Sequence, residues 1–158
     1  MDKNKVVLFD IDYTLFDTAF FKESNLLKHK IYEEVIDVLN SLNKIAILGV
    51  FSEGDIDFQI NKIKETNIDQ YFAKENTHVV LDKLVDLEKI FERYKSKKTF
   101  LVDDKLDILY DVKKLFPEVF TIWVKRGPFA ENQREIPGFK PDAEVTDLKE
   151  IVSLILNT

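Results

Sequence analysis

The stretch VVLFDIDYTL, residues 6–15, decides the fold of this chain, because an apolar run ends there in two aspartates one residue apart. Such a run predicts a strand buried on both faces, as in a parallel sheet, and open parallel sheets bind their ligands at the carboxyl ends of their strands. Because side chains alternate along a strand, Asp10 and Asp12 are expected on one side, within reach of one reacting atom. Two carboxylates so placed suit a nucleophile and a general acid/base.

Apolar runs and helical patterns alternate along the rest of the chain. Strands are expected at residues 6–11, 44–51, 78–81, 99–103, 119–124 and 143–145. Apolar residues recur at helical spacing in five other segments: Ile31, Val35, Leu39 and Leu42; Ile56, Ile60 and Ile63; Leu84, Leu87, Phe91 and Tyr94; Leu106, Leu109, Val112 and Phe116; and Leu148, Ile151, Val152 and Ile155. The alternation predicts an α/β fold, a three-layer α/β/α sandwich around a mainly parallel, Rossmann-like doubly wound sheet.

The composition excludes several classes of protein and site. With 158 residues, the chain is expected to form one domain, residues 1–158, with a core that needs no disulfide or metal staples. It has no cysteine, which excludes thiolate chemistry and fits a reducing compartment. The net charge of −6 argues against a nucleic-acid partner. The longest uncharged apolar stretch, residues 45–51, is too short to cross a bilayer, so we expect a soluble cytoplasmic protein.

Polar residues recur at the ends of the later predicted strands. They are Ser52 after the second strand, Lys83 after the third, and Asp103, Asp104 and Asp107 after the fourth. Together with Asp10, Asp12 and Thr14, these residues resemble the motifs of the haloacid dehalogenase-like (HAD) hydrolases, whose first motif is Asp-x-Asp-x-Thr after an apolar strand. Gln59 and Lys62 are also similar to residues of many family members. The resemblance covers residues 5–155.

The resemblance implies a Mg²⁺-dependent phosphatase that forms an aspartyl-phosphate on Asp10. The ion would be held by a carboxylate oxygen of Asp10, the main-chain carbonyl of Asp12, and Asp103, with waters completing its octahedron. Asp104 and Asp107 are further candidate ligands, either directly or through water. Asp12 would protonate the leaving alkoxide and then activate the water that hydrolyses the intermediate.

The same resemblance assigns phosphate binding to Thr14, Ser52 and Lys83. Thr14 and Ser52 also have simpler roles open to them, as a turn former and as a helix cap. Lys62 is an alternative to Lys83 as the lysine that binds phosphate. Glu53 departs from the family pattern, in which a neutral residue is usual at this place, so it either repels phosphate, faces solvent or recognises a cationic group of the substrate.

Residues 15–29 are too few for the cap domain with which family members tell substrates apart. Between Thr14 and a helix expected to start near Lys30, they are predicted to form a short flap or lid. The apolar residues of the flap either pack on the core or form a lid or a homodimer contact. The expected partner is a phosphorylated substrate, either a small molecule or a larger phosphorylated partner.

Two other functions stay open at this stage. Receiver-like signalling modules also combine a doubly wound sheet, an acidic Mg²⁺ pocket and a phosphorylated aspartate. Their acids follow other strands, whereas Asp103 and Asp104 follow the fourth predicted strand here. The third candidate is a catalytically silent phosphate-binding domain, in which Glu53 has spoiled the site. Turnover of a generic phosphomonoester would separate the phosphatase from both.

Overall fold

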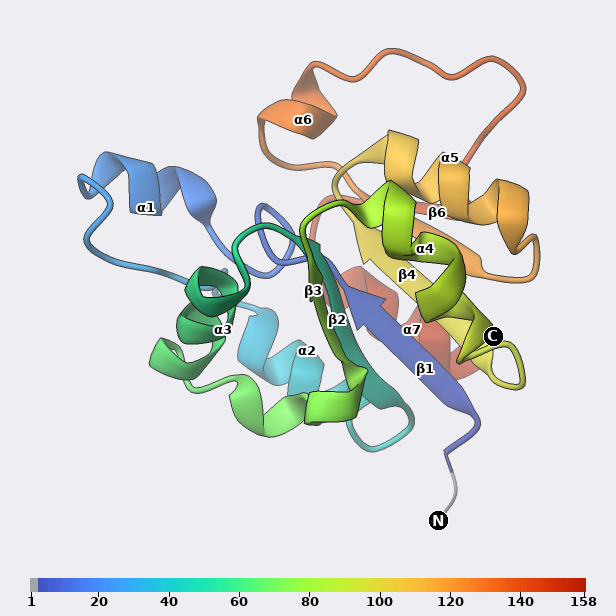
Figure 1. The fold of residues 1–158 in the computed structure, drawn as a ribbon, viewed down its shortest axis with the longest axis horizontal. Helices are drawn as coiled ribbons and strands as arrows, with labels where there is room; N and C mark the ends of the chain where they lie inside the picture. Colours follow the sequence, from blue (N-terminus) through green and yellow to red (C-terminus); the bar gives the residue numbers. More distant parts are fainter. Residues whose placement is uncertain (1–2) are drawn as a thin grey trace.

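The structure, a computed structural model, describes residues 3–158 and is built on one six-stranded sheet. The strands are β1 (Lys5–Phe9), β2 (Ile47–Glu53), β3 (Thr77–Val80), β4 (Lys98–Asp103), β5 (Phe120–Val124) and β6 (Ala143–Val145). They pair in the order β3-β2-β1-β4-β5-β6, and every pair is parallel (Figure 1). The predicted doubly wound parallel sheet is confirmed.

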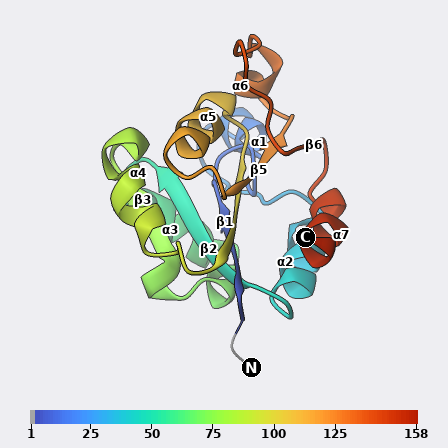
Figure 2. The same ribbon diagram turned by 90° about the vertical axis from the view of Figure 1, so that its right-hand side faces the viewer.

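Helices cover both faces of the sheet. They are α1 (Thr18–Glu23), α2 (Val35–Leu42), α3 (Ile56–Glu65), α4 (Lys83–Glu92), α5 (Leu106–Leu115), α6 (Pro128–Glu131) and α7 (Lys149–Asn157), with short 3₁₀ turns at Asp69–Tyr71 and Lys74–Asn76. Side chains of α2, α3 and α7 join one core cluster, and those of α4 and α5 join the other. Figure 2 shows α2 and α7 on one side of β1 and α4 on the other. Within residues 3–158, no helix has both the length and the apolar character needed to span a membrane.

The central strand β1 explains why the sheet is buried on both sides. Its residues Val7 and Phe9 belong to one core cluster, while Val6 and Leu8 belong to the other, and all four are fully buried. A strand inside a parallel sheet needs apolar residues at every position because helices pack on both of its faces. The predicted three layers are therefore confirmed.

The predicted helix near Lys30 starts later, at Val35. Ile31 pairs with Phe16 in an isolated antiparallel bridge, and the Tyr32 N–H donates to the Leu15 carbonyl over 3.0 Å. These residues are held in extended pairing with the segment that leaves β1, so they cannot join the helix.

That pairing closes the base of a protruding segment, residues 17–30, which carries α1. The Asp17 N–H donates to the Lys30 carbonyl over 2.8 Å where the segment leaves and returns. Figure 1 shows α1 standing away from the sheet.

The second strand was predicted at residues 44–51 but spans Ile47–Glu53. Ile45 and Ala46 both donate backbone hydrogen bonds to the Leu42 carbonyl and so complete the end of α2. At the other end, Ser52 and Glu53 pair with β3, which extends the strand into the region of the predicted site.

Two predicted apolar helix stripes are wrong in part. Ile56 and Leu84 are exposed, at 51% and 58%, although each begins a predicted stripe. The buried face of α3 instead carries Gln59, Lys62 and Ile63. Both side chains lie in the first turn of their helix, at the carboxyl edge of the sheet, and face solvent there.

Gly49 in β2 provides a test of the packing between β2 and its neighbours. A Cβ atom there would lie 2.5 Å from the Asn76 carbonyl oxygen and 2.7 Å from Leu8 Cδ2. Gly49→Ala should therefore lower the free energy of unfolding by about 1–3 kcal/mol, as overpacking does. Gly138→Asn is the control, because nothing lies within 4 Å and asparagine tolerates its φ of +76°. Denaturant titration of both variants measures the effect, and equal losses would contradict the packing argument.

Candidate active site

The carboxyl ends of β1 and β4 lie side by side at the point where the strand order reverses. Chain connections leave this point in opposite directions, which opens a crevice for ligands in doubly wound sheets. Asp10 directly follows β1. Asp103 is the last residue of β4, and Asp104 directly follows it. The Asp10 N–H donates to the Val102 carbonyl over 2.9 Å, which holds the two strand ends together.

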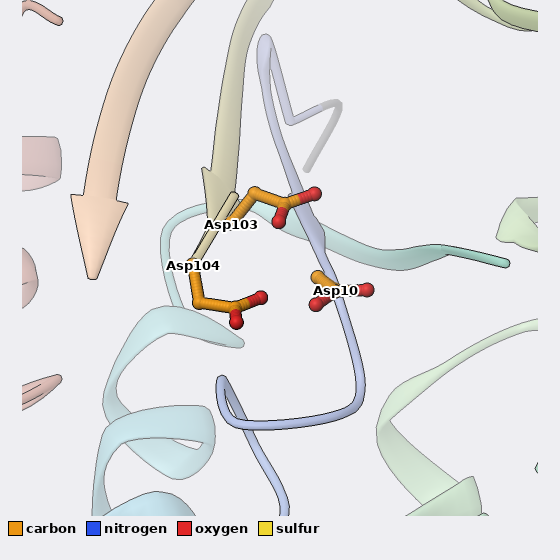
Figure 3. Close-up of side chains that lie close together, drawn as sticks. All are labelled: Asp10, Asp103 and Asp104. Atoms are coloured by element: carbon orange, nitrogen blue, oxygen red, sulfur yellow. The ribbon is translucent and has the colours of Figure 1, made fainter. Parts of the chain in front are cut away.

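Asp10, Asp103 and Asp104 form a compact group of buried acids, and their carboxyl groups face a common space in Figure 3. One oxygen from each lies within 4.8 Å of the others. Asp103 accepts the Lys105 N–H over 2.9 Å, whereas neither oxygen of Asp104 has a hydrogen-bond partner among residues 3–158. Burying a carboxylate without a partner is costly, so the group is expected to bind a cation or a proton.

Lys83 supplies one positive charge to this group. Its Nζ lies 3.0 Å from Asp10 Oδ1 and 2.7 Å from Asp103 Oδ2, and its side chain is buried. Lys83 is the first residue of α4, whose N-terminus is capped by Asp82. The Lys83 N–H also donates to a carboxylate oxygen of Glu53 over 3.0 Å. Both the backbone and the side chain of Lys83 are therefore fixed.

The pKa values of Asp103 and Asp104 lie above the usual range of an aspartate. Burial raises the pKa of Asp103 to about 6, with a further increase from Asp10 that Lys83 opposes. Burial, followed by the charges of Asp10 and Asp103, raises the pKa of Asp104 to about 10. Burial disfavours the charged form of Lys83, but Asp10 and Asp103 outweigh it and raise the pKa of Lys83. With all three carboxylates ionised, the group carries two negative charges more than Lys83 neutralises, and a proton on Asp104 or a divalent metal ion would reduce this excess.

Asp12 lies in a separate hydrogen-bond network. Its Oδ1 lies 2.5 Å from Lys62 Nζ and accepts the Thr18 hydroxyl over 2.9 Å, and its Oδ2 accepts the Gln59 amide over 3.0 Å. Burial alone would raise the pKa of Asp12, but Lys62, Gln59 and Thr18 together hold it below its usual value. The two aspartates of the first motif thus form ion pairs with two different lysines.

Comparison with known proteins identifies the fold. No protein-family model and no curated protein sequence matches the chain. A Burkholderia xenovorans structure described as a haloacid dehalogenase-like hydrolase matches with a TM-score of 0.82 over 99% of this chain and 98% of its own, at 19% identity. A Bacillus subtilis HAD-hydrolase described as bound to magnesium has a TM-score of 0.76, 12% identity, and coverage of 98% and 99%. The chain has the HAD-like fold. A Haemophilus somnus structure described as a predicted phosphoglycolate phosphatase has a TM-score of 0.72, 13% identity, and coverage of 98% and 99%.

The HAD-like fold excludes the receiver-like alternative. Receivers such as CheY have the strand order 2-1-3-4-5, which places the third strand beside the first. Here β1 lies between β2 and β4, so the acids that follow β1 and β4 are direct neighbours. The receiver-like interpretation is therefore wrong.

Thr14 and Ser52, the two predicted hydroxyl ligands of phosphate, are fully enclosed. The Thr14 hydroxyl lies 3.5 Å from Asp10 Oδ2, and the Ser52 hydroxyl accepts the Gln59 amide over 3.2 Å. Their exposed fractions are 0% and 1%. Thr14 contacts Asp10 directly, and Ser52 is linked to Asp12 through the Gln59 amide. Their contact with phosphate stays a prediction.

Two further acids named from the sequence, Asp107 and Glu53, lie outside the group of Asp10, Asp103 and Asp104. Asp107 is exposed in the first turn of α5. Glu53 accepts the backbone N–H of Lys83, so its carboxylate is placed at the N-terminus of α4, where a negative charge is favourable.

A pocket of about 380 Å³ opens above Asp10 and Asp12 and reaches Lys83, Lys62 and the α1 segment. A larger cavity of about 1260 Å³ lies under the loop of residues 133–144, beside β5, and contains none of the three grouped acids. The smaller pocket is therefore the candidate active site.

Three residues of the site had no role predicted from the sequence. Gln59 and Thr18 donate hydrogen bonds to Asp12. Gln59 lies on the buried face of α3, and a polar residue on the buried face of a helix is a pattern from which the sequence could have indicated a role. Arg126 donates to the Thr14 carbonyl and to Glu34, each over 2.5 Å, and so fixes the turn after Asp10. No local pattern could show this contact, because Arg126 and Thr14 are 112 residues apart.

The grouped acids fit a divalent metal ion. Mg²⁺ and Ca²⁺ prefer oxygen ligands, and Asp104 offers two carboxylate oxygens that are buried and without partners in the described chain. Asp10 and Asp103 each offer another carboxylate in reach of the same point. Lys83 satisfies only one oxygen of each of these two residues.

Asp104→Asn tests this group directly. In the presence of a chelator, it should raise the free energy of unfolding by about 1–3 kcal/mol, because the wild type must either protonate Asp104 or bury it as an unpartnered charge, whereas asparagine is neutral. Folding raises the pKa of Asp104 above its unfolded value, so the wild type loses stability as the pH rises from about 5 to 8 and the gain should grow over that range. Thermal melts across pH measure both effects.

In millimolar Mg²⁺ the order should reverse. The wild type should gain RT ln(1 + [L]/Kd) of stability, and Asp104→Asn should gain less. Asp107→Asn removes the same charge outside the group and should keep the full Mg²⁺ gain. An equal Mg²⁺ gain in the wild type and Asp104→Asn would contradict the proposed metal group.

Proposed function

We propose that this chain is a Mg²⁺-dependent phosphatase that transfers the phosphoryl group of a phosphomonoester to Asp10 and then to water. The observation that carries the proposal is the buried group of Asp10, Asp103 and Asp104, in which Lys83 contacts Asp10 and Asp103. Asp10 and Lys83 also line the open pocket. An aspartate can attack a phosphoryl dianion only where positive charge offsets their repulsion. The HAD-like fold, and the magnesium and phosphatase descriptions of two structures that share it, support the proposal.

The proposed reaction has two steps at Asp10. A carboxylate oxygen of Asp10 attacks phosphorus, and the bond from phosphorus to the leaving oxygen breaks as the new bond forms. Asp12 gives a proton to that oxygen, so the product leaves as an alcohol. Asp12 then takes a proton from a water molecule that attacks the same phosphorus. Phosphate leaves, and the Asp10 carboxylate is restored.

The positive charges at Asp10 come from Lys83 and from the expected metal ion. Asp10, Asp103 and Asp104 would hold Mg²⁺, with the main-chain carbonyl of Asp12 as a further ligand implied by the family resemblance. Bound there, Mg²⁺ would neutralise charge on the phosphoryl oxygens. Lys83 keeps the Asp10 carboxylate in place and has its ammonium beside the reacting oxygen, where it can donate to the phosphoryl group.

The second lysine acts on Asp12 in this proposal. Lys62, Gln59 and Thr18 fix the position of the Asp12 carboxylate and lower its pKa. This favours release of its proton to the leaving oxygen, and the carboxylate so formed is placed to take a proton from water. Lys83, rather than Lys62, is therefore assigned to the phosphoryl group.

The silent-domain alternative depended on repulsion of phosphate by Glu53. The Glu53 carboxylate accepts the Lys83 N–H at the start of α4, so it has a structural role that does not require a spoiled site. No other contact of the described chain favours a silent domain, and turnover of a generic phosphomonoester decides the matter.

Variants of the two aspartates test the division of labour. Asp10→Asn should lower turnover of an aryl phosphate by roughly 10⁴-fold or more and abolish the phosphoenzyme trapped by acid quench, because the nucleophile is lost. Asp12→Asn should lower kcat by about 10²–10⁴-fold, as loss of a general acid/base does, while keeping most of the Mg²⁺-induced rise in melting temperature. Retention of activity by Asp10→Asn would refute the mechanism.

A paired comparison tests the two lysines. Lys83→Met should reduce kcat/KM by roughly 10²-fold or more, because it removes a charge beside the reacting oxygen. Lys62→Met should lower kcat with little change in KM, because Lys62 acts only through Asp12, and Lys62→Arg should restore part of the loss. Steady-state kinetics measure both. A larger loss of kcat/KM in Lys62→Met than in Lys83→Met would reverse the assignment.

A further inference from the structure

Most of the exposed apolar side chains lie at the edge of the sheet that carries the candidate active site. Within residues 3–158, the large hydrophobic side chains that are exposed are Leu26, Leu27, Ile56, Phe58, Leu81, Leu84, Val85, Leu115, Phe129 and Leu156. All but Leu115 and Leu156 follow the carboxyl end of a strand, which is the edge of the sheet that carries Asp10. Single exposed leucines are common on protein surfaces, but a gathering at one edge indicates a surface that meets something apolar.

Part of this apolar edge forms the wall of the pocket itself. Leu26, Phe58 and Phe129 line the pocket above Asp10, together with the partly or fully buried Phe21 and Tyr13. The Phe21 and Phe58 rings lie 5.9 Å apart, and the Tyr13 and Phe129 rings lie 6.1 Å apart. Two aromatic pairs therefore border the space that a substrate would occupy.

The acids in the pocket wall already have partners. Asp55 accepts the Phe58 N–H over 2.8 Å at the start of α3, and Glu53 accepts the Lys83 N–H over 3.0 Å at the start of α4. Asp12 accepts hydrogen bonds on both of its oxygens. These acids are thus committed to contacts within the chain.

The two cations at the mouth lie over aromatic rings. Lys22 Nζ is 5.7 Å from the centre of the Tyr13 ring, and Lys105 Nζ is 4.4 Å from that of Phe129. The Gln59 side-chain oxygen has no partner in the described chain, but it is buried. The pocket wall therefore offers apolar contact and few free groups for hydroxyls.

The backbone conformation of Leu26 also supports a contact with an apolar ligand. Leu26 has a φ of +65°, a left-handed conformation that is unfavourable for leucine, and it is 63% exposed. Burial within the chain does not offset this cost. A contact between the Leu26 side chain and a ligand would explain why leucine occupies an exposed position with a positive φ.

We propose that the site selects phosphomonoesters with an apolar alkyl or aryl leaving group over polyhydroxylated ones of the same size; this selectivity rests on the phosphatase function proposed above. A phosphoryl group at Asp10 directs its leaving group away from the nucleophile, in line, toward the mouth of the pocket. Each methylene that the wall removes from water favours binding about fourfold. A hydroxyl that loses its water without gaining a partner is disfavoured.

Two matched substrates test the selectivity. Cyclohexyl phosphate and myo-inositol 1-phosphate both carry a six-membered ring on a secondary oxygen and differ in their ring hydroxyls. With Mg²⁺, the wild type should show a kcat/KM at least about tenfold higher for cyclohexyl phosphate.

Leu26→Asn is the decisive variant, because asparagine tolerates a positive φ and the fold should keep its melting temperature. It should lower the cyclohexyl-to-inositol ratio several-fold by lowering kcat/KM for cyclohexyl phosphate. Leu27→Asn is the matched control, since Leu27 is 80% exposed and is not part of the pocket wall. It should leave the ratio unchanged.

The possible failures are distinguishable. No turnover of either substrate, or of an aryl phosphate, refutes the phosphatase function and the selectivity with it. Turnover of both substrates without preference, or an equal change in the ratio for Leu26→Asn and Leu27→Asn, refutes the selectivity alone. Light scattering that shows a dimer dissociated by Leu26→Asn would also overturn it, because the apolar edge would then belong to a second copy of the chain.

Discussion

The contact of the Lys83 ammonium with Asp10 and Asp103 is the interaction on which the site depends. It joins the ends of β1 and β4 to the start of α4, at the one place where neighbouring strand connections diverge. One lysine cannot neutralise three buried carboxyl groups, and the excess appears in the pKa of Asp104, raised to about 10 by burial and by its two acidic neighbours. With all three acids ionised, the site lacks two positive charges, which suits it to a divalent metal ion and, through it, to a phosphoryl group.

The two aspartates of the first motif differ in environment although one residue separates them. Asp10 shares Lys83 with a second acid, whereas Asp12 pairs with Lys62 and accepts hydrogen bonds from Gln59 and Thr18. Neighbouring carboxyl groups that have different surroundings can take different chemical roles. In the proposed mechanism, this separation makes Asp10 the nucleophile and Asp12 the proton carrier. The apolar mouth adds the third component, a wall that distinguishes leaving groups.

Much of the fold follows from local patterns. A parallel strand buried on both faces must be apolar throughout, so the strands were visible, and the carboxyl ends of such strands meet at one edge. Asp10, Asp103 and Lys83 could therefore be placed together before their contacts were known. The start of α2 could not be predicted, because pairing between Phe16 and Ile31 overrides the helical periodicity. The exposed positions of Ile56 and Leu84 were missed because periodicity does not show where a helix reaches the edge of its sheet.

The sequence by itself determined the doubly wound α/β architecture and the positions of the acids at strand ends, because both depend on local hydrophobic patterns. Which lysine contacts which aspartate depends on the tertiary structure. Lys62 lies 50 residues from its partner Asp12, and Lys83 lies 73 residues from its partner Asp10. The tertiary structure also decided that Asp104 is buried without a partner while Asp107 is exposed. Burial and pairing of charges are properties of the packed chain, and residues far apart in the sequence set them.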